Sequence, residues 1–167
     1  SWSVVTRNII VIGASAVGVE AVPRLLGSLS TGIKAAFFVT LHVPPHVTSV
    51  LPTIIARQGW LHAEHPGDGT PIRPGHIYVA PPDFHLLLEH DVVRLGHGPK
   101  ENGHRPAIDV MFRSAARFYG ERVAGVLLTG YLDDGVAGLQ EIQKHCGLSI
   151  VQDPAEAAYP ELPRNAL

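Results

Sequence analysis

Three side-chain types that together form a nucleophilic relay follow apolar runs of the sequence. Ser15 comes shortly after one run, His42 ends a second, and Asp133 and Asp134 follow a third, just before a predicted helix. In such a relay the imidazole takes the hydroxyl proton and the carboxylate orients the imidazole. Loops that follow parallel strands meet at the same edge of a sheet. The residue types and their places therefore indicate a candidate serine hydrolase site, with the choice between the two aspartates open.

The elements that would position these residues can be predicted from the apolar runs. Buried strands are expected at 8–12, 35–41, 77–80, 123–128 and 149–151, and helices at 19–29, 47–57, 108–119 and 136–144. Their alternation implies right-handed crossovers and a parallel sheet. Residues 84–89 and 92–95 flank His90-Asp91 and predict a hairpin. The expected fold class is α/β, three-layer and doubly wound, with a mostly parallel sheet and a small antiparallel hairpin excursion.

Each candidate also has a structural interpretation. Ser15 could cap the helix that follows it, and His42 could bond a backbone carbonyl. Asp133 and Asp134 could be capping and turn residues before Gly135. The residues alone leave both interpretations open, and only the coincidence of all three at strand ends favours catalysis.

The turn Gly13–Gly18 matches neither of two known glycine-rich motifs. In a dinucleotide-binding turn a glycine stands where Ser15 is, and the second strand ends in an acidic residue rather than Leu41-His42. The nucleophile elbow of α/β-hydrolases requires glycine at the position of Val17. We therefore expect neither a nucleotide cofactor nor an α/β-hydrolase.

The ten histidines raise the question of a metal site. His42 and His46 are four residues apart, but Pro44 and Pro45 interrupt any helix between them. His62 and a second histidine three residues later lie in a short, strand-like stretch with no third ligand nearby. No ligand set matches a known zinc pattern, so the sequence predicts no metal and no cofactor.

Composition narrows the class of protein further. A net charge of -2 gives no electrostatic reason for nucleic-acid binding, and no apolar run is long enough for a membrane span. The lone Cys146 excludes an internal disulfide, which fits a cytoplasmic protein. We interpret the loop with Lys100, His104 and Arg105 as solvated surface rather than a substrate-facing rim. Residues 1–167 are expected to form one domain whose last helix reads as cut short.

Several ordered motifs resemble the catalytic domain of CheB-type protein-glutamate methylesterases of bacterial chemotaxis. They cover nearly the whole chain and comprise 12–15 with Gly18 and 20–21, 42–44, 74–86, 105–116, 127–130 with 134–139, 152–157 and 163–166. The resemblance implies Ser15 as nucleophile, His42 as general base and Asp134, not Asp133, as the orienting carboxylate. It further implies hydrolysis of glutamate γ-methyl esters on the cytoplasmic helices of chemoreceptors, with glutamine deamidation as a companion activity.

The chain departs from the family pattern close to the expected site. Ala16-Val17 replaces the usual Thr-Gly, Tyr131-Leu132 replaces Met-Gly, and Cys146-Gly147 replaces Gly-Gly. Ala16 and Tyr131 are the candidates for the oxyanion and substrate pocket. These departures keep two alternatives open: a weak or silent binding module of the same fold, or a hydrolase of a different ester.

Regulated members of the family carry an N-terminal phosphoreceiver domain, and none is expected within this chain. The expected partners are methylated chemoreceptor helices, with no nucleic acid and no membrane insertion.

Overall fold

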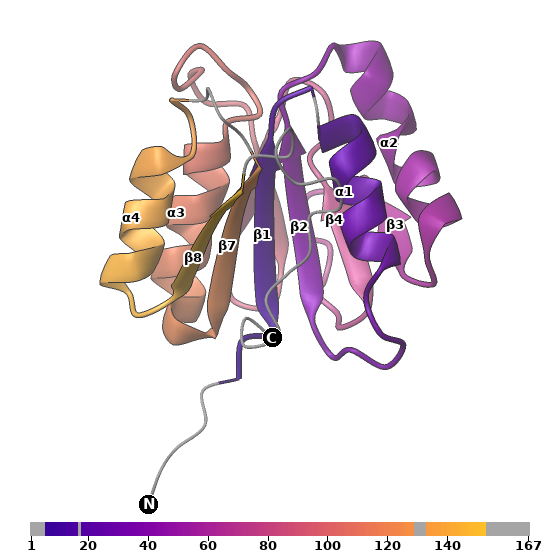
Figure 1. The fold of residues 1–167 in the computed structure, drawn as a ribbon. Helices are drawn as coiled ribbons and strands as arrows, with labels where there is room; N and C mark the ends of the chain where they lie inside the picture. The colour runs from indigo at the N-terminus through magenta and orange to yellow at the C-terminus, as the bar shows by residue number, and fades with distance from the viewer. Residues whose placement is uncertain (1–5, 17, 129–132, 153–167) are drawn as a thin grey trace, which may run out of the picture.

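The computed structural model describes residues 6–16, 18–128 and 133–152. Its main feature is a six-stranded parallel sheet in the order β3-β4-β2-β1-β7-β8 (Figure 1). The strands are β1 (Ile9–Ala14), β2 (Ala36–Leu41), β3 (His62–Glu64), β4 (His76–Val79), β7 (Val123–Leu128) and β8 (Leu148–Gln152). The shortened last helix predicted near residue 163 lies outside the described residues.

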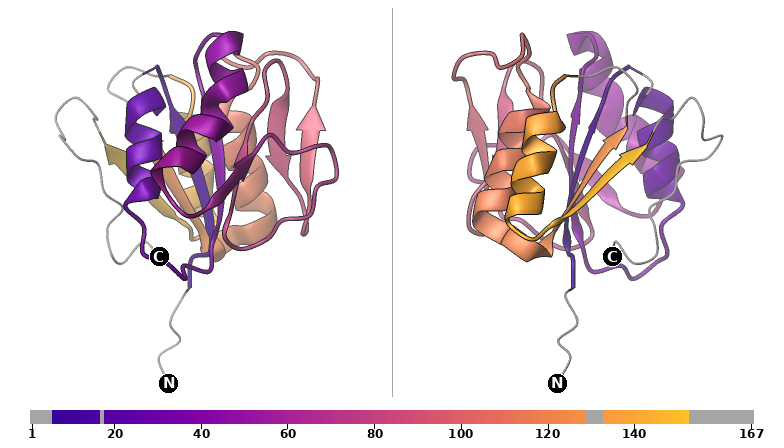
Figure 2. Two further views of the ribbon diagram at one scale, coloured as in Figure 1. Left: turned by 90° about the vertical axis from the view of Figure 1, so that its right-hand side faces the viewer. Right: turned by 60° about the vertical axis from the view of Figure 1, so that its left-hand side comes forward.

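Helices cover both faces of this sheet, as Figures 1 and 2 show. One face carries α1 (Gly18–Gly27) and α2 (Pro45–Gln58). The other carries α3 (Ile108–Tyr119), the 3-10 turn Gly120–Arg122, α4 (Val136–Lys144) and the antiparallel hairpin of β5 (His85–Leu88) and β6 (Val93–Gly96). The predicted three-layer α/β fold with a small hairpin is therefore confirmed.

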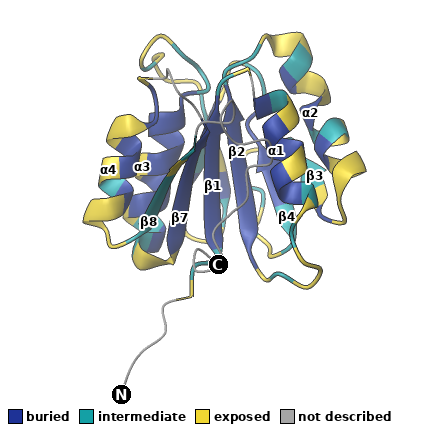
Figure 3. Cartoon of the chain, in the orientation of Figure 1, coloured by how far each residue is buried: buried dark blue, intermediate teal, exposed yellow. Residues whose placement is uncertain are grey.

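The central strands are buried along their whole length because both of their faces are covered (Figure 3). Along β1, Ile10 and Ile12 pack toward α1 and α2, whereas Val11 packs toward α3. This explains why these strands are continuous apolar runs in the sequence rather than alternating ones.

The order of the strands reverses beside β1, which makes this the place where loops diverge to form a crevice. Ala14, the last residue of β1, is paired with Leu41 of β2 on one side and Leu128 of β7 on the other. The segments that follow these three strands therefore leave the sheet at the same edge.

The stretch at His62, which the sequence described only as strand-like, forms the strand β3. The three-residue β3 pairs in parallel with β4 at the edge of the sheet. Within the described part of the chain, no helix is both long and apolar enough to span a membrane.

Candidate active site

The imidazole of His42 and the carboxylate of Asp134 are in direct contact. His42 Nε2 lies 2.8 Å from Asp134 Oδ2, and the two side chains are only 7% and 1% exposed. The ring N–H is not aligned as a regular hydrogen bond requires, and His42 Nδ1 has no hydrogen-bond partner. Asp134 therefore contacts one ring nitrogen at close range, and the other nitrogen is left to receive a proton.

The carboxylate of Asp134 is fixed by the amino end of α3. It accepts hydrogen bonds from the backbone N–H groups of Ile108 at 2.6 Å and Asp109 at 2.8 Å, and from Asn102 Nδ2 at 3.1 Å. Burial alone would raise the pKa of Asp134, but the contact with His42 and the hydrogen bonds from these two backbone groups and Asn102 outweigh it and lower the pKa. Asp134 therefore stays ionised beside His42, as a carboxylate that orients an imidazole must.

The carboxylate of Asp109 caps the start of α4, as that of Asp134 caps the start of α3. Its Oδ1 accepts the backbone N–H groups of Gly135 at 2.9 Å and Gly138 at 2.7 Å, and its Oδ2 accepts Asn102 Nδ2 at 2.8 Å. Each carboxylate thus satisfies the free N–H groups at the start of the other's helix. Asp134 does cap a helix, but the helix is α3 rather than α4, the one it precedes.

Sequence reasoning assigned no role to Asp109 or Asn102. An acidic residue in the first turn of a helix is a recognisable signal, because it suits the positive end of the helix dipole. That signal cannot show that the acceptor serves a second helix, which contacts α3 only in the folded chain.

Ser15 lies on the neighbouring strand end. It directly follows Ala14, and His42 directly follows Leu41, to which Ala14 is paired. The backbone N–H of His42 donates to the carbonyl of Ala14 at 2.9 Å, so the two segments run side by side. The Ser15 hydroxyl makes no hydrogen bond to His42 in this structure, where His42 Nδ1 has no partner.

The turn after Ser15 is shaped by a glycine. The Ser15 carbonyl accepts the N–H of Gly18 at 2.9 Å. A Cβ on Gly18 would lie 2.6 Å from Ala14 Cβ and 2.9 Å from a Leu41 methyl, so only glycine lets α1 start this close to β1 and β2. Because α1 begins at Gly18, Ser15 lies before the usual capping position, which argues against a purely capping role.

His104 covers the other side of the imidazole. Its ring stacks on that of His42 with centroids 3.6 Å apart and planes inclined by 7°. Burial, followed by the proximity of His42, lowers the pKa of His104, which favours a neutral ring against the base. The interpretation of this loop as plain surface is therefore wrong for His104. It fits the exposed Lys100, whereas Arg105 anchors the loop by hydrogen bonds to Asp83.

A cleft of about 290 Å³ opens beside the His42 ring. It is lined by Leu41, His42, Val43, Pro44, His104, Arg105 and Pro106. Its walls combine polar and apolar groups and include the imidazole of His42, so a small ester group has access to His42 from this side. The exposed Asp133 makes no ion pair within the described ranges, and so the structure brings Asp134 rather than Asp133 to His42.

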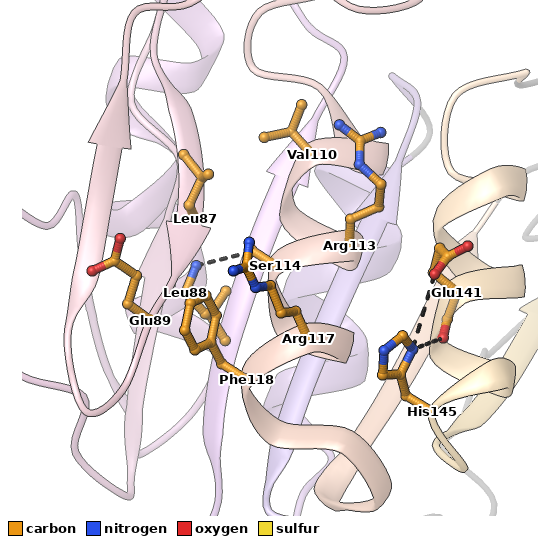
Figure 4. A pocket seen from close by; sticks show the side chains of 10 residues that line it. All are labelled: Leu87, Leu88, Glu89, Val110, Arg113, Ser114, Arg117, Phe118, Glu141 and His145. Carbon is orange, nitrogen blue, oxygen red and sulfur yellow. Dashed lines mark hydrogen bonds and ion pairs between the residues drawn. The ribbon is translucent and has the colours of Figure 1, made fainter.

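A larger hollow of about 610 Å³ between β5, α3 and α4 contains reactive residue types but no comparable relay (Figure 4). The Ser114 hydroxyl there donates to the Met111 carbonyl and accepts the Leu88 N–H. His145 is bonded to Glu141 of its own helix (Figure 4). Both hydrogen bonds of the Ser114 hydroxyl are thus to the backbone, and no histidine among the described residues is hydrogen-bonded to it.

The sequence predicted Ala16 and Tyr131 as residues of the oxyanion and substrate pocket. Ala16 is exposed directly after Ser15, and its carbonyl accepts the N–H of Val19 at 3.1 Å. Tyr131 lies outside the described residues, so its predicted place near the oxyanion stays a prediction.

Comparisons with known proteins identify similar sequences and a similar solved structure. A family model described as CheB methylesterase matches residues 10–167. A protein-glutamate methylesterase/protein-glutamine glutaminase 2 of Methanosarcina mazei is 36% identical over 165 residues, covering 94% of this chain and 45% of the relative. A protein-glutamate methylesterase/protein-glutamine glutaminase of Azospirillum brasilense is 38% identical over 158 residues, covering 92% of this chain and 40% of the relative. The crystal structure of the Thermotoga maritima CheB methylesterase catalytic domain matches with a TM-score of 0.83 and 30% identity, covering 97% of this chain and 88% of that one.

The chain spans less than half the length of these two curated relatives, and nearly all of the solved catalytic domain. The shared region is therefore the one that corresponds to a catalytic domain.

Proposed function

Because the chain belongs to the CheB methylesterase family, we propose that it hydrolyses γ-methyl esters of glutamate residues on the cytoplasmic helices of chemoreceptors. Ser15 is the nucleophile, His42 the general base and Asp134 the orienting carboxylate. The observation that carries this proposal is the 2.8 Å contact of His42 with a buried Asp134 at the edge of the sheet where Ser15 follows β1.

The first half of the reaction forms an acyl-enzyme. The Ser15 hydroxyl oxygen attacks the ester carbonyl carbon, and its proton passes to His42, whose Nδ1 is the nitrogen without a partner. The resulting imidazolium is stabilised by the ionised Asp134. The same proton then goes to the departing methoxide, which leaves as methanol. The hydrogen bond between hydroxyl and imidazole has to form as substrate binds, as is common for sites seen without substrate.

The second half of the reaction regenerates the free enzyme. Water enters, gives a proton to His42 and attacks the acyl carbon, and Ser15 recovers its proton as the glutamate carboxylate is released. Backbone N–H groups near Ala16 and Tyr131 serve as oxyanion donors in this proposal. A glutamine side chain would follow the same course with ammonia as the leaving group, which gives the deamidase activity.

The test is release of methanol from chemoreceptor-containing membranes whose receptors carry radioactive methyl groups. The purified chain should release labelled methanol, and His42→Ala should lower the rate by several orders of magnitude because the proton acceptor is lost. His46→Ala is the matched control, since His46 is an exposed histidine on α2, and it should keep the wild-type rate. Receptor binding without methanol release would instead favour a silent binding module of the same fold.

A different substrate would give another pattern. If methanol is released from simple methyl esters but not from receptors, the relay is active and the proposed substrate is wrong.

A further inference from the structure

Two histidines and a glutamate converge at the end of the sheet opposite the His42–Asp134 pair. His62 and Glu64 belong to β3, the outer strand in Figure 1, and His76 is the first residue of β4. The register pairs His62 with His76, and Glu64 lies two residues further along β3, on the same face. One ring nitrogen from each histidine and one carboxylate oxygen all lie within 4.8 Å of one another.

This spacing fits a metal ion after small side-chain movements. Three atoms no more than 4.8 Å apart all lie within about 2.8 Å of a common point. Zinc binds imidazole nitrogen and carboxylate oxygen at about 2.0–2.2 Å. Each ligand atom therefore has to move inward by less than about 1 Å to coordinate one ion.

Within the described residues these three side chains have ring contacts, of His76 with His62 and Tyr78, but no ion pair that would compete with a metal. None of the ion pairs among residues 6–16, 18–128 and 133–152 involves His62, Glu64 or His76. His76 Nδ1 is fully buried and has no hydrogen-bond partner. Buried polar atoms are nearly always paired, so an unpaired ring nitrogen on a histidine of this cluster favours a role in binding a ligand.

The relevant histidines are not the pair that the sequence suggested. His65 points elsewhere, because its Nδ1 lies 3.0 Å from the Val79 carbonyl and its Nε2 3.0 Å from the Thr48 carbonyl. Strand pairing brings in His76 instead, fourteen residues after His62. The third ligand is Glu64, two residues after His62, which the sequence analysis did not count as a ligand.

We propose that His62, Glu64 and His76 bind one zinc ion. Two imidazoles and one carboxylate are a known zinc ligand set, and imidazole suits zinc among the divalent metals. His62 is exposed, so water would complete the coordination sphere. The ion ties the three-residue edge strand β3 to β4 and stabilises this end of the sheet. It takes no part in ester hydrolysis, since the catalytic residues follow the opposite ends of the strands.

The test is calorimetric titration of zinc into the chelator-treated, dialysed protein, with thermal unfolding measured in parallel. Wild type should bind one zinc ion per chain and unfold at a higher temperature with zinc. His62→Ala, Glu64→Gln and His76→Gln should each weaken binding by at least about tenfold and lose most of the zinc-dependent stabilisation. His46→Gln controls for exposed histidines, and His42→Ala controls for binding at the catalytic site; both should bind as wild type does.

Two outcomes would overturn the proposal. One is the absence of saturable zinc uptake by folded wild type, and the other is unchanged uptake in the His62 and Glu64 variants. These two residues lie on an exposed edge strand, so they decide the matter even if His76→Gln fails to fold. The methanol assay is a separate readout, and its failure would leave this result unaffected.

Discussion

Replacing Asp109 tests whether the exchange of carboxylates between α3 and α4 holds the site together. In Asp109→Ala the buried N–H groups of Gly135 and Gly138 lose the oxygen that both now contact, at 2.9 Å and 2.7 Å. Each buried donor left without an acceptor costs about 1–3 kcal/mol. We therefore expect the free energy of unfolding to fall by about 3–4 kcal/mol, which is a large share of the roughly 5–15 kcal/mol of a typical domain.

The matched control is Asp109→Asn. The asparagine oxygen can still accept both glycine N–H groups. Only the hydrogen bond from Asn102 is lost, because the new amide nitrogen is a donor, so the expected loss is about 1 kcal/mol. Urea unfolding followed by circular dichroism measures both values, and the alanine variant should melt roughly 6–16 °C below wild type. If the two variants lose the same stability within about 0.5 kcal/mol, the capping oxygen is not what stabilises this corner, and the reasoning is refuted.

Three further predictions concern the neighbourhood of the base. Gly18→Ala should cost about 1–3 kcal/mol, because its Cβ would clash at 2.6 Å, whereas Gly98→Ala, with nothing within 4 Å, should be neutral in the same urea experiment. His104→Ala should lower kcat/KM about tenfold, since the ring that stacks on His42 is lost, and His104→Phe should restore most of the rate; equal rates for wild type and both variants would exclude a positioning role. The pKa of Asp134 is lowered from 3.8 in the folded state, so its ionisation contributes stability that is complete above that value and is lost as the pH falls through the lower, folded pKa. Asp134→Asn should accordingly lose less stability than wild type between pH 5 and pH 2 in acid titrations of unfolding, and parallel curves would contradict this.

The sequence was sufficient to predict the helices and strands that are long and apolar. All four helices and five of the six parallel strands that the structure describes agree with the predictions to within about two residues. The strands could be predicted because burial on both faces leaves a continuous apolar run, as in Val123–Leu128. The bounds predicted for α3 and α4 are those observed. The hairpin of β5 and β6 was also predicted correctly, and its turn lies at His90-Asp91.

What the sequence could not provide depends on contacts between distant segments. The strand β3 has three residues, two of them charged or polar at the sheet edge, and so lacks an apolar signature. The roles of Asp109, Asn102 and His104 arise only when the loop before α3 packs against Asp134 and His42. The assignment of Asp134 rather than Asp133 came from the family resemblance, and the contact with His42 now supplies a physical reason for it.

Covalent labelling tests whether the His42–Asp134 pair activates Ser15, and it does so without assuming a substrate. A fluorophosphonate reacts with a serine whose proton is taken up by a neighbouring base, and mass spectrometry of the digested protein identifies the modified residue. We expect a single adduct on Ser15 in wild type, no adduct in Ser15→Ala, and labelling slowed by orders of magnitude in His42→Ala. An unlabelled Ser15 in the folded wild-type protein, or labelling that is unchanged without His42, would contradict this activation.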